Sequence, residues 1–462
     1  MAHPVDTIAD ALLARATAFV REHRLPGASI GVVHGRDLVW TASLGFADVA
    51  AGRAPTPHTL YQVASITKTV TATAVLQLRD AALLHLDDPV VDVLPELRAA
   101  ASPHGPVESL TLRRLLAHES GLMSEPPGAD YTVGRYESNP AATLADAGAI
   151  RVAVGTNAQH KYSNLAYQLL GEVVTRVAGV PYTRYVRDRI LDPLGLRSSW
   201  FAPLPAEAHA ARATGYDARW LSDVLTPSAP PVGFEAEGGL ASCVVDLARW
   251  LAFQTHDAAR DSGDEEVLAA ATLAEMHRAR YLADDAWTEA FGLSWYTVRR
   301  DDVGWVQHSG GDIGFVTNIC FDPATSVGAI VLLNAPGPAS DLSMALAAEA
   351  RTVVRAAPAM LSAPAPLPPA FAPLLGVYLL AEFGELHRVE WRDGRLTLIE
   401  RAEHTRHRTL TPTEDADTFV VDPGFRESGE PVHFTRTSDG RVAALTYSGA
   451  TLPRLDPVRD VS

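Results

Sequence analysis

Cysteine is scarce in this chain of 462 residues, which contains only Cys243 and Cys320. Two cysteines are too few for a disulfide framework, and their spacing fits no metal-ligand pattern. No H-E-x-x-H segment or comparable cluster of metal ligands occurs in the sequence either. We therefore expect two reduced cysteines buried in the packing, no metal site and no cofactor.

Long hydrophobic runs are also missing. The most apolar run, residues 327–335, is far shorter than the roughly 20 residues that cross a bilayer. The first residues show no basic segment followed by an apolar one, the pattern of a secretion signal. These absences predict a cytoplasmic protein with no membrane partner.

Positive charge is in deficit, with 39 Lys and Arg against 55 Asp and Glu and a net charge of −16. Such a chain repels a phosphate backbone, and no local cluster of basic residues offsets the excess, so nucleic acid is excluded as a partner. The hydrophobic fraction of 47% and charged fraction of 20% are those of folded globular domains. The length predicts more than one domain.

Hydrophobic periodicity predicts the architecture of the larger part of the chain. Residues 28–33 and 38–43 have the alternation of a hairpin, and so do residues 316–321 and 327–334. Between these two hairpins, helical periodicity occurs at residues 67–83, 110–116 and 164–178. Strands at both ends with helices between them predict a split α+β domain.

The end of the chain has a different pattern. After a helix expected near residues 340–355, residues 356–373 are rich in Ala and Pro, which is typical of a semi-rigid linker. Short alternating stretches separated by turns follow from residue 374. We predict a first domain over residues 1–355, this linker, and a small antiparallel β-barrel over residues 374–462.

The first candidate catalytic motif is Ser65-Ile66-Thr67-Lys68, at the start of an apolar-periodic helix. Residues three apart on a helix share a face, so the Lys68 amine can reach the Ser65 hydroxyl. A serine becomes a nucleophile when a base removes its proton, and burial can lower the pKa of a lysine enough for that task. The alternative is a helix cap at Ser65 with a solvated Lys68, which the tetrapeptide alone does not exclude.

The second motif is Tyr162-Ser163-Asn164, at the entry to another helix. A phenol near positive charges loses its proton more easily and could shuttle it to a leaving group. The two-sided amide of Asn164 could hold Lys68 and a substrate amide carbonyl. The alternative is a helix N-cap with a packing aromatic ring.

The third motif is His308-Ser309-Gly310-Gly311, which we place just before the strand at residues 315–321. Consecutive glycines let a substrate backbone come close, and the Gly311 N–H could form an oxyanion hole with that of Ser65. His308 could supply a switchable positive charge. The alternative is a glycine-rich turn with solvated side chains.

Taken together and in this order, S-x-x-K, Y-x-N and H-x-G resemble the serine β-lactamase and penicillin-binding-protein superfamily, particularly the class C β-lactamase-like serine hydrolases. The resemblance covers roughly residues 5–350 and implies a β-lactamase-like domain, with an antiparallel sheet flanked by helices plus an all-helical region. It implies that Ser65 forms an acyl-enzyme and that Lys68 and Tyr162 move protons. It also implies an oxyanion hole of Ser65 and Gly311 and substrate contacts from Asn164, His308, Ser309 and Gly310.

One departure from the family pattern bears on the substrate. His308 stands where many members have a lysine, and an unperturbed histidine is mostly neutral at pH 7, so capture of a substrate carboxylate should be weaker. Family members with H-x-G act as esterases or D-aminopeptidases. We expect an esterase or D-amino-acid peptidase with weak or no β-lactamase activity, acting on a small ester, amide or short D-peptide.

Several alternatives stay open at this point. The same acyl-serine could belong to a penicillin-binding sensor without turnover, or to an acyltransferase in which an alcohol or amine replaces water. A homo-oligomer is neither predicted nor excluded. An α/β-hydrolase is disfavoured because Ser309 is followed by strand-like residues, whereas a G-x-S-x-G elbow leads into a helix. Aromatic residues in the segments expected to line the cleft could grip a substrate or only pack: Tyr131, Tyr136, Tyr216 and Phe234.

Overall fold

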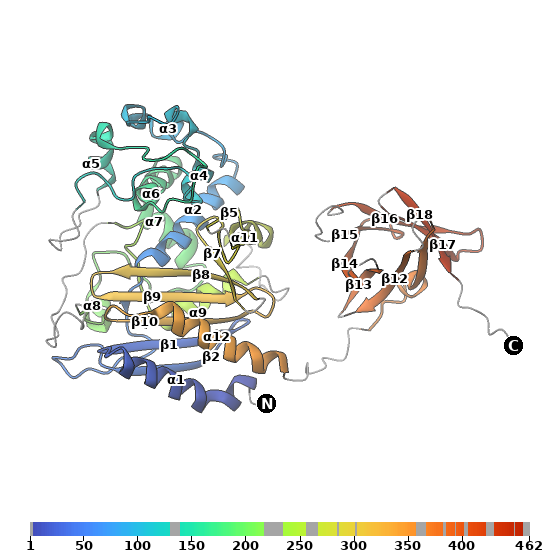
Figure 1. Cartoon of the computed structure of the whole chain (residues 1–462), viewed down its shortest axis with the longest axis horizontal. Helices are drawn as coiled ribbons and strands as arrows, with labels where there is room; N and C mark the ends of the chain where they lie inside the picture. The colour runs from blue at the N-terminus through green and yellow to red at the C-terminus, as the bar shows by residue number, and fades with distance from the viewer. Residues whose placement is uncertain are drawn as a thin grey trace. The chain divides into compact units, whose positions relative to one another are not determined.

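The structure is a computed structural model of the whole chain. It describes residues 3–129, 139–216, 234–255, 267–283, 286–300, 303–356, 366–381, 385–392, 394–401, 405–421, 429–447 and 449–455. The chain divides into two compact units, residues 1–357 and 358–462 (Figure 1). The expected fold class is confirmed: a mixed α+β unit is followed by an antiparallel barrel.

An eight-stranded antiparallel sheet forms the base of the first unit, in the order β2-β1-β10-β9-β8-β7-β6-β5. The two hairpins predicted at opposite ends of the domain lie side by side in this sheet, because β1 pairs with β10. Both strands are buried along nearly their whole length, as their continuous apolar runs require. The strands are β1 (Gly27–His34), β2 (Asp37–Gly45), β5 (Tyr281–Leu282), β6 (Glu289–Phe291), β7 (Tyr296–Arg300), β8 (Val303–Asp312), β9 (Phe315–Asp322) and β10 (Val327–Leu333).

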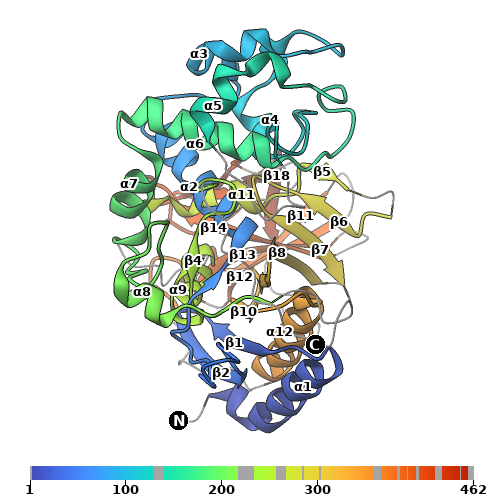
Figure 2. The ribbon, with the colours of Figure 1, turned by 90° about the vertical axis from the view of Figure 1, so that its left-hand side faces the viewer.

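The two faces of this sheet pack into separate cores. Along β10, Val331 and Leu333 point into the core shared with the terminal helices α1 (Ala9–Glu22) and α12 (Ala339–Ala356). Ile330 and Leu332 point the other way, into the core shared with α9 (Val244–Gln254) and the helical region. Figure 2 shows α1 and α12 lying side by side although they come from opposite ends of the unit.

The helical region lies beyond β8 (Figure 1). It contains Lys68 of the first motif and Asn164 of the second. Its two central helices, α2 (Thr67–Asp80) and α6 (Asn164–Ala178), pack against each other. A two-stranded sheet of β3 (Tyr61–Gln62) and β4 (Ala241–Ser242) leads into α2. The remaining helices are α3 (Val90–Val93), α4 (Leu112–Leu116), α5 (Pro140–Ala145), α7 (Tyr182–Val186), α8 (Ala206–Ala211) and α11 (Ala270–His277), with short turns η1 (Pro4–Ile8), η2 (Ala64–Ile66), η3 (Pro95–Ala99), η4 (Val107–Ser109), η5 (Ala147–Ala149) and η6 (Arg187–Leu191).

The second unit is a closed barrel preceded by η7 (Ala372–Leu374). Closure pairs the first and last strands, so the barrel has no open edge. Alternate residues such as Val432 and Phe434 fill its interior. The strands are β11 (Gly376–Leu380), β12 (Glu385–Arg392), β13 (Arg395–Arg401), β14 (Thr405–Pro412), β15 (Thr418–Val421), β16 (Pro431–Arg436), β17 (Val442–Tyr447) and β18 (Ala450–Leu455).

Further expectations concern the cysteines, membrane-crossing helices and the aromatic residues of the cleft. Cys243 and Cys320 are both free thiols and both buried. Among the described residues, no helix is at once long enough and apolar enough to cross a membrane. The predicted aromatic residues Tyr131 and Tyr136 lie outside the described part of the chain. Tyr216 and Phe234 are buried, and the Tyr216 hydroxyl accepts a hydrogen bond from the Val49 N–H, so both pack within the fold.

Candidate active site

Ser65 stands on a strained turn between β3 and α2. The preceding residue, Ala64, has a φ of +48°, a left-handed conformation that a residue with a side chain seldom adopts. The turn is closed by a hydrogen bond from the Ile66 N–H to the Val63 carbonyl. It leaves the Ser65 side chain partly exposed, in a pocket of about 420 Å³ that also contains Tyr162 and Gly311.

Lys68 lies one turn further along and is completely buried. Its ammonium donates to Ser65 Oγ at 3.0 Å and to the Glu237 carbonyl at 2.5 Å. Burial lowers the pKa of Lys68 to about 7, against the opposing effect of the Glu237 and Glu125 carboxylates. A large share of the amine is therefore neutral near pH 7 and able to accept the Ser65 proton.

Tyr162 comes two residues before α6, whose N-cap Ser163 accepts from the Ala166 N–H at 3.0 Å. Its ring is 5.0 Å from the Lys68 ammonium. Burial raises the pKa of Tyr162 well above its usual value, and a hydrogen bond with Ser65 only partly offsets this. The expectation of an easily ionised phenol was therefore wrong: next to Lys68, Tyr162 stays a neutral hydrogen-bond donor.

A buried histidine supports this tyrosine. His118 accepts a hydrogen bond at Nδ1 from the Ser163 N–H at 3.1 Å, and its ring lies 4.2 Å from that of Tyr162. Burial, with Lys68 next in effect, lowers the pKa of His118 well below its usual value. His118 belongs to none of the three motifs, and nothing in the sequence spacing relates it to Tyr162.

The third motif lies inside β8, directly before β9 as we expected, so the alternative of a glycine-rich turn is wrong. The strand packs against η2, and a Cβ added to Gly310 would overlap the Val63 carbonyl at the base of the Ser65 turn. A Cβ on Gly311 would meet nothing within 4 Å. Gly310 therefore allows the strand to approach Ser65, whereas Gly311 leaves open space for another molecule.

His308 is only 1% exposed. Its Nδ1–H donates to the Ser309 carbonyl at 2.7 Å, which leaves Nε2 as an unprotonated acceptor, and this atom has no hydrogen-bond partner among the described residues. Burial, and after it the charge of Lys68, lowers the pKa of His308 to about 3. The expected switchable positive charge is therefore wrong, because His308 is neutral at every pH near 7.

Ser309 alternates to the other side of the strand. Its Oγ accepts from the Asn318 amide at 2.8 Å, and the Asn318 carbonyl oxygen accepts from Ser343 of α12 at 2.5 Å. The hydroxyl is thus already engaged in a network that joins β8, β9 and α12. Although Ser309 lines the pocket, this network gives its side chain a role in holding the strand.

Asn164 occupies the first residue of α6. Its amide nitrogen donates to both carboxylate oxygens of Glu125, at 2.8 and 3.0 Å. From the sequence we expected Asn164 to hold Lys68 and a substrate carbonyl, and Glu125 was not selected. Glu125 lies outside the helices and strands, where no periodic pattern or motif would have identified it.

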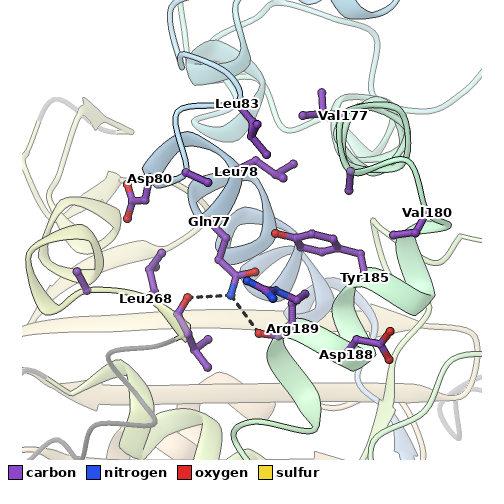
Figure 3. A pocket seen from close by; sticks show the side chains of 14 residues that line it. Gln77, Leu78, Asp80, Leu83, Val177, Val180, Tyr185, Asp188, Arg189 and Leu268 are labelled. Carbon is purple, nitrogen blue, oxygen red and sulfur yellow. Dashed lines mark hydrogen bonds between the residues drawn. The ribbon is translucent and has the colours of Figure 1, made fainter.

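Another cavity, of about 540 Å³, lies at the C-terminal end of α2 (Figure 3). The Gln77 amide there donates to the carbonyls of Arg189 and Val267, at 3.1 and 2.8 Å. None of the residues that line it belongs to the three motifs. The pocket at Ser65 therefore remains the candidate active site.

Comparisons with known proteins agree with this arrangement. Residues 9–353 match the Beta-lactamase family. Penicillin-binding protein 4 of Amycolatopsis lactamdurans is 30% identical over 382 residues, which cover 79% of this chain and 96% of that protein. The octameric penicillin-binding protein homologue from Pyrococcus abyssi has a TM-score of 0.63 at 23% identity, and covers 96% of this chain and 99% of its own.

The solved structure of SurE has a TM-score of 0.61 at 27% identity, covering 98% of this chain and 100% of SurE. A second structure, of SurE with D-Leu, has a TM-score of 0.59 at 26% identity and covers 97% of this chain. Both matches span the second unit as well as the first.

Proposed function

Because this chain belongs to the β-lactamase family, we propose that it is a serine hydrolase that forms an acyl-enzyme at Ser65 and cleaves ester or amide bonds. The observation that carries the proposal is the buried Lys68 amine, 3.0 Å from Ser65 Oγ with a pKa near 7. A serine needs such a base, and a lysine with an ordinary pKa would be protonated at neutral pH.

In acylation, neutral Lys68 takes the proton of Ser65 while Oγ forms a bond to the substrate carbonyl carbon. The N–H groups of Ser65 and Gly311 receive the oxyanion, since both residues line the same pocket. The bond from the carbonyl carbon to the leaving group then breaks as Tyr162 gives that group its phenolic proton. Tyr162 recovers a proton from the Lys68 ammonium, which lies 5.0 Å from its ring. Water then attacks the acyl-serine by the reverse proton path, which releases the acid and restores Ser65.

The neutral state of His308 supports an esterase or D-amino-acid peptidase over a β-lactamase. Penicillins carry a carboxylate, and a buried imidazole with a pKa of about 3 offers it no positive charge. SurE, with a similar fold and 26% identity, has been solved with D-Leu, which favours testing D-aminoacyl compounds first.

The test is intact-mass spectrometry of the wild type and Ser65→Ala after exposure to p-nitrophenyl acetate and, separately, to a penicillin, with nitrophenol release followed in parallel. We expect turnover and a transient adduct with the ester in the wild type only. Equal behaviour of Ser65→Ala and the wild type would refute the catalytic assignment.

A penicillin-binding sensor is the second candidate, favoured by the 30% identity to Penicillin-binding protein 4. It predicts a stable penicillin adduct on Ser65 and no turnover of the ester. The same mass spectra separate the two functions.

A further inference from the structure

Glu125 brings a carboxylate to the edge of the candidate active site. Its two oxygens accept from the Asn164 amide at 2.8 and 3.0 Å, and Asn164 is two residues from Tyr162. The negative charge of Glu125 also contributes to raising the pKa values of Lys68 and Tyr162, the two groups that contact Ser65. Glu125 is thus close enough to act on the charge of a bound substrate.

The loop that carries Glu125 is pinned to the start of α6. The Ser163 hydroxyl donates to the Met123 carbonyl at 2.7 Å, and the Asn164 N–H donates to the Ser124 carbonyl at 2.7 Å. The Lys161 ammonium donates to the Ser124 hydroxyl at 2.9 Å. These bonds fix the carboxylate relative to Tyr162 before a substrate arrives, and such preorganisation reduces the entropy lost on binding.

We infer that Glu125, positioned by Asn164, binds a primary ammonium group on the acyl part of the substrate, so that the preferred substrates are aminoacyl amides or esters with a free amine. This inference rests on the function proposed above. A carboxylate has about four acceptor sites and accepts from several donors at once, so the Asn164 amide and an ammonium can share it. An α-amino group lies two bonds from the carbonyl carbon that Ser65 attacks, and its partner must therefore stand beside the catalytic groups, as Glu125 does.

Glu289 is the rival carboxylate and provides a matched control. It lines the pocket at Ser65 from β6, where its side chain is exposed. Burial raises the pKa of Tyr296 to about 12, and the charge of Glu289 adds to this effect. Glu289 lies on the strand side of the pocket and not on the loop pinned to α6. If charge anywhere in the pocket were sufficient, both glutamates would matter equally.

The experiment measures kcat/KM of the full chain for D-leucine p-nitroanilide and for its N-acetyl derivative, which lacks the ammonium. We expect the wild type to prefer the free amine and Glu125→Gln to reduce that preference about 10- to 100-fold, because glutamine keeps the size but not the charge. Glu125→Asp should retain part of the preference, and Glu289→Gln should retain nearly all of it. Labelling of Ser65 with a fluorophosphonate probe checks that each variant is folded.

Three results would overturn the inference. An equal loss on both substrates in Glu125→Gln would make Glu125 a general base or a structural residue. A preference that disappears in Glu289→Gln would assign the ammonium to the other carboxylate. A wild type that hydrolyses p-nitrophenyl acetate through Ser65 but does not prefer the free amine would refute this inference alone, whereas no Ser65-dependent hydrolysis of any compound would refute the proposed function with it.

Discussion

At the scale of single residues, burial decides which groups in the pocket carry charge. Lys68, Tyr162 and His308 all sit where water is largely excluded, and in each case burial is the leading cause of the pKa shift toward the neutral form. The result is a site with a neutral base, a neutral phenol and a neutral imidazole. In the proposed mechanism, protons then move among Ser65, Lys68 and Tyr162, starting from uncharged groups in a poorly solvated place.

The pH dependence of activity should report Lys68. In the proposed mechanism its neutral amine is the active form, and because burial lowers its pKa to about 7, kcat/KM should fall about tenfold per pH unit below pH 7 and level off above it. The measurement is p-nitrophenyl acetate hydrolysis from pH 5 to 9. Lys68→Arg should lose about 10³-fold at every pH, since a guanidinium does not deprotonate in this range. A wild-type profile that stays flat down to pH 5 would show that another group is the base.

Restoring a cation at His308 should change substrate preference. The His308 ring lies 5.7 Å from the Tyr296 ring, and both residues line the pocket. We expect His308→Lys to raise the second-order rate constant for penicillin acylation of Ser65 about tenfold, since it adds a charge that attracts the penicillin carboxylate. Intact-mass time courses measure this rate. If this rate constant does not change in a variant that still reacts with p-nitrophenyl acetate, the charge at position 308 does not decide how well the penicillin carboxylate is bound.

The three motifs in their order were sufficient to select Ser65 and Lys68, and the three-residue spacing accounts for their approach to 3.0 Å. It could not reveal Glu125 or the neutral state of His308. The first depends on a loop folding against the start of α6, and the second depends on how completely the surrounding strands and helices exclude water. Both are tertiary properties that no local pattern encodes.

At the scale of elements, the two glycines of β8 have separate tasks. Gly310→Ala should destabilise the first unit by about 3 kcal/mol and lower its melting temperature, because the new Cβ overlaps the Val63 carbonyl beneath Ser65. Gly311→Ala is the matched control, with no atom within 4 Å of its Cβ, and should keep the wild-type melting temperature. Thermal unfolding of both variants tests the difference. Equal melting temperatures would show that β8 does not need this close approach.

Element boundaries followed the strength of the periodic pattern. The helix predicted at residues 164–178 is α6, and the helix predicted at 340–355 is α12 with one more residue at each end. The short strands β5 and β6 were missed, because two or three residues cannot display alternation. The strand β8 around the H-x-G-G segment was not predicted, and two consecutive glycines weaken strand propensity, whereas pairing with β9 holds the segment in the sheet.

At the scale of the whole molecule, each unit has its own apolar core. The cores on the two faces of the sheet belong to the first unit, and the barrel encloses a third. The composition of residues 356–373 suggested a boundary there, but the number and order of barrel strands needed the structure. Strands β11, β14 and β18 carry too few alternating apolar residues to be identified from sequence alone.

Separate cores lead to a prediction about truncation. A closed barrel with all its strands paired and a filled interior should fold without further support, and so should a unit that contains a complete sheet and both of its cores. We expect residues 1–357 to be soluble, to unfold cooperatively and to retain labelling of Ser65 by a fluorophosphonate probe. Scanning calorimetry of the full chain and of residues 1–357 measures this, with the barrel transition absent from the shorter protein. The prediction is contradicted if residues 1–357 aggregate, or if they lose Ser65 labelling while the full chain keeps it. In either case the first unit needs the barrel in order to fold.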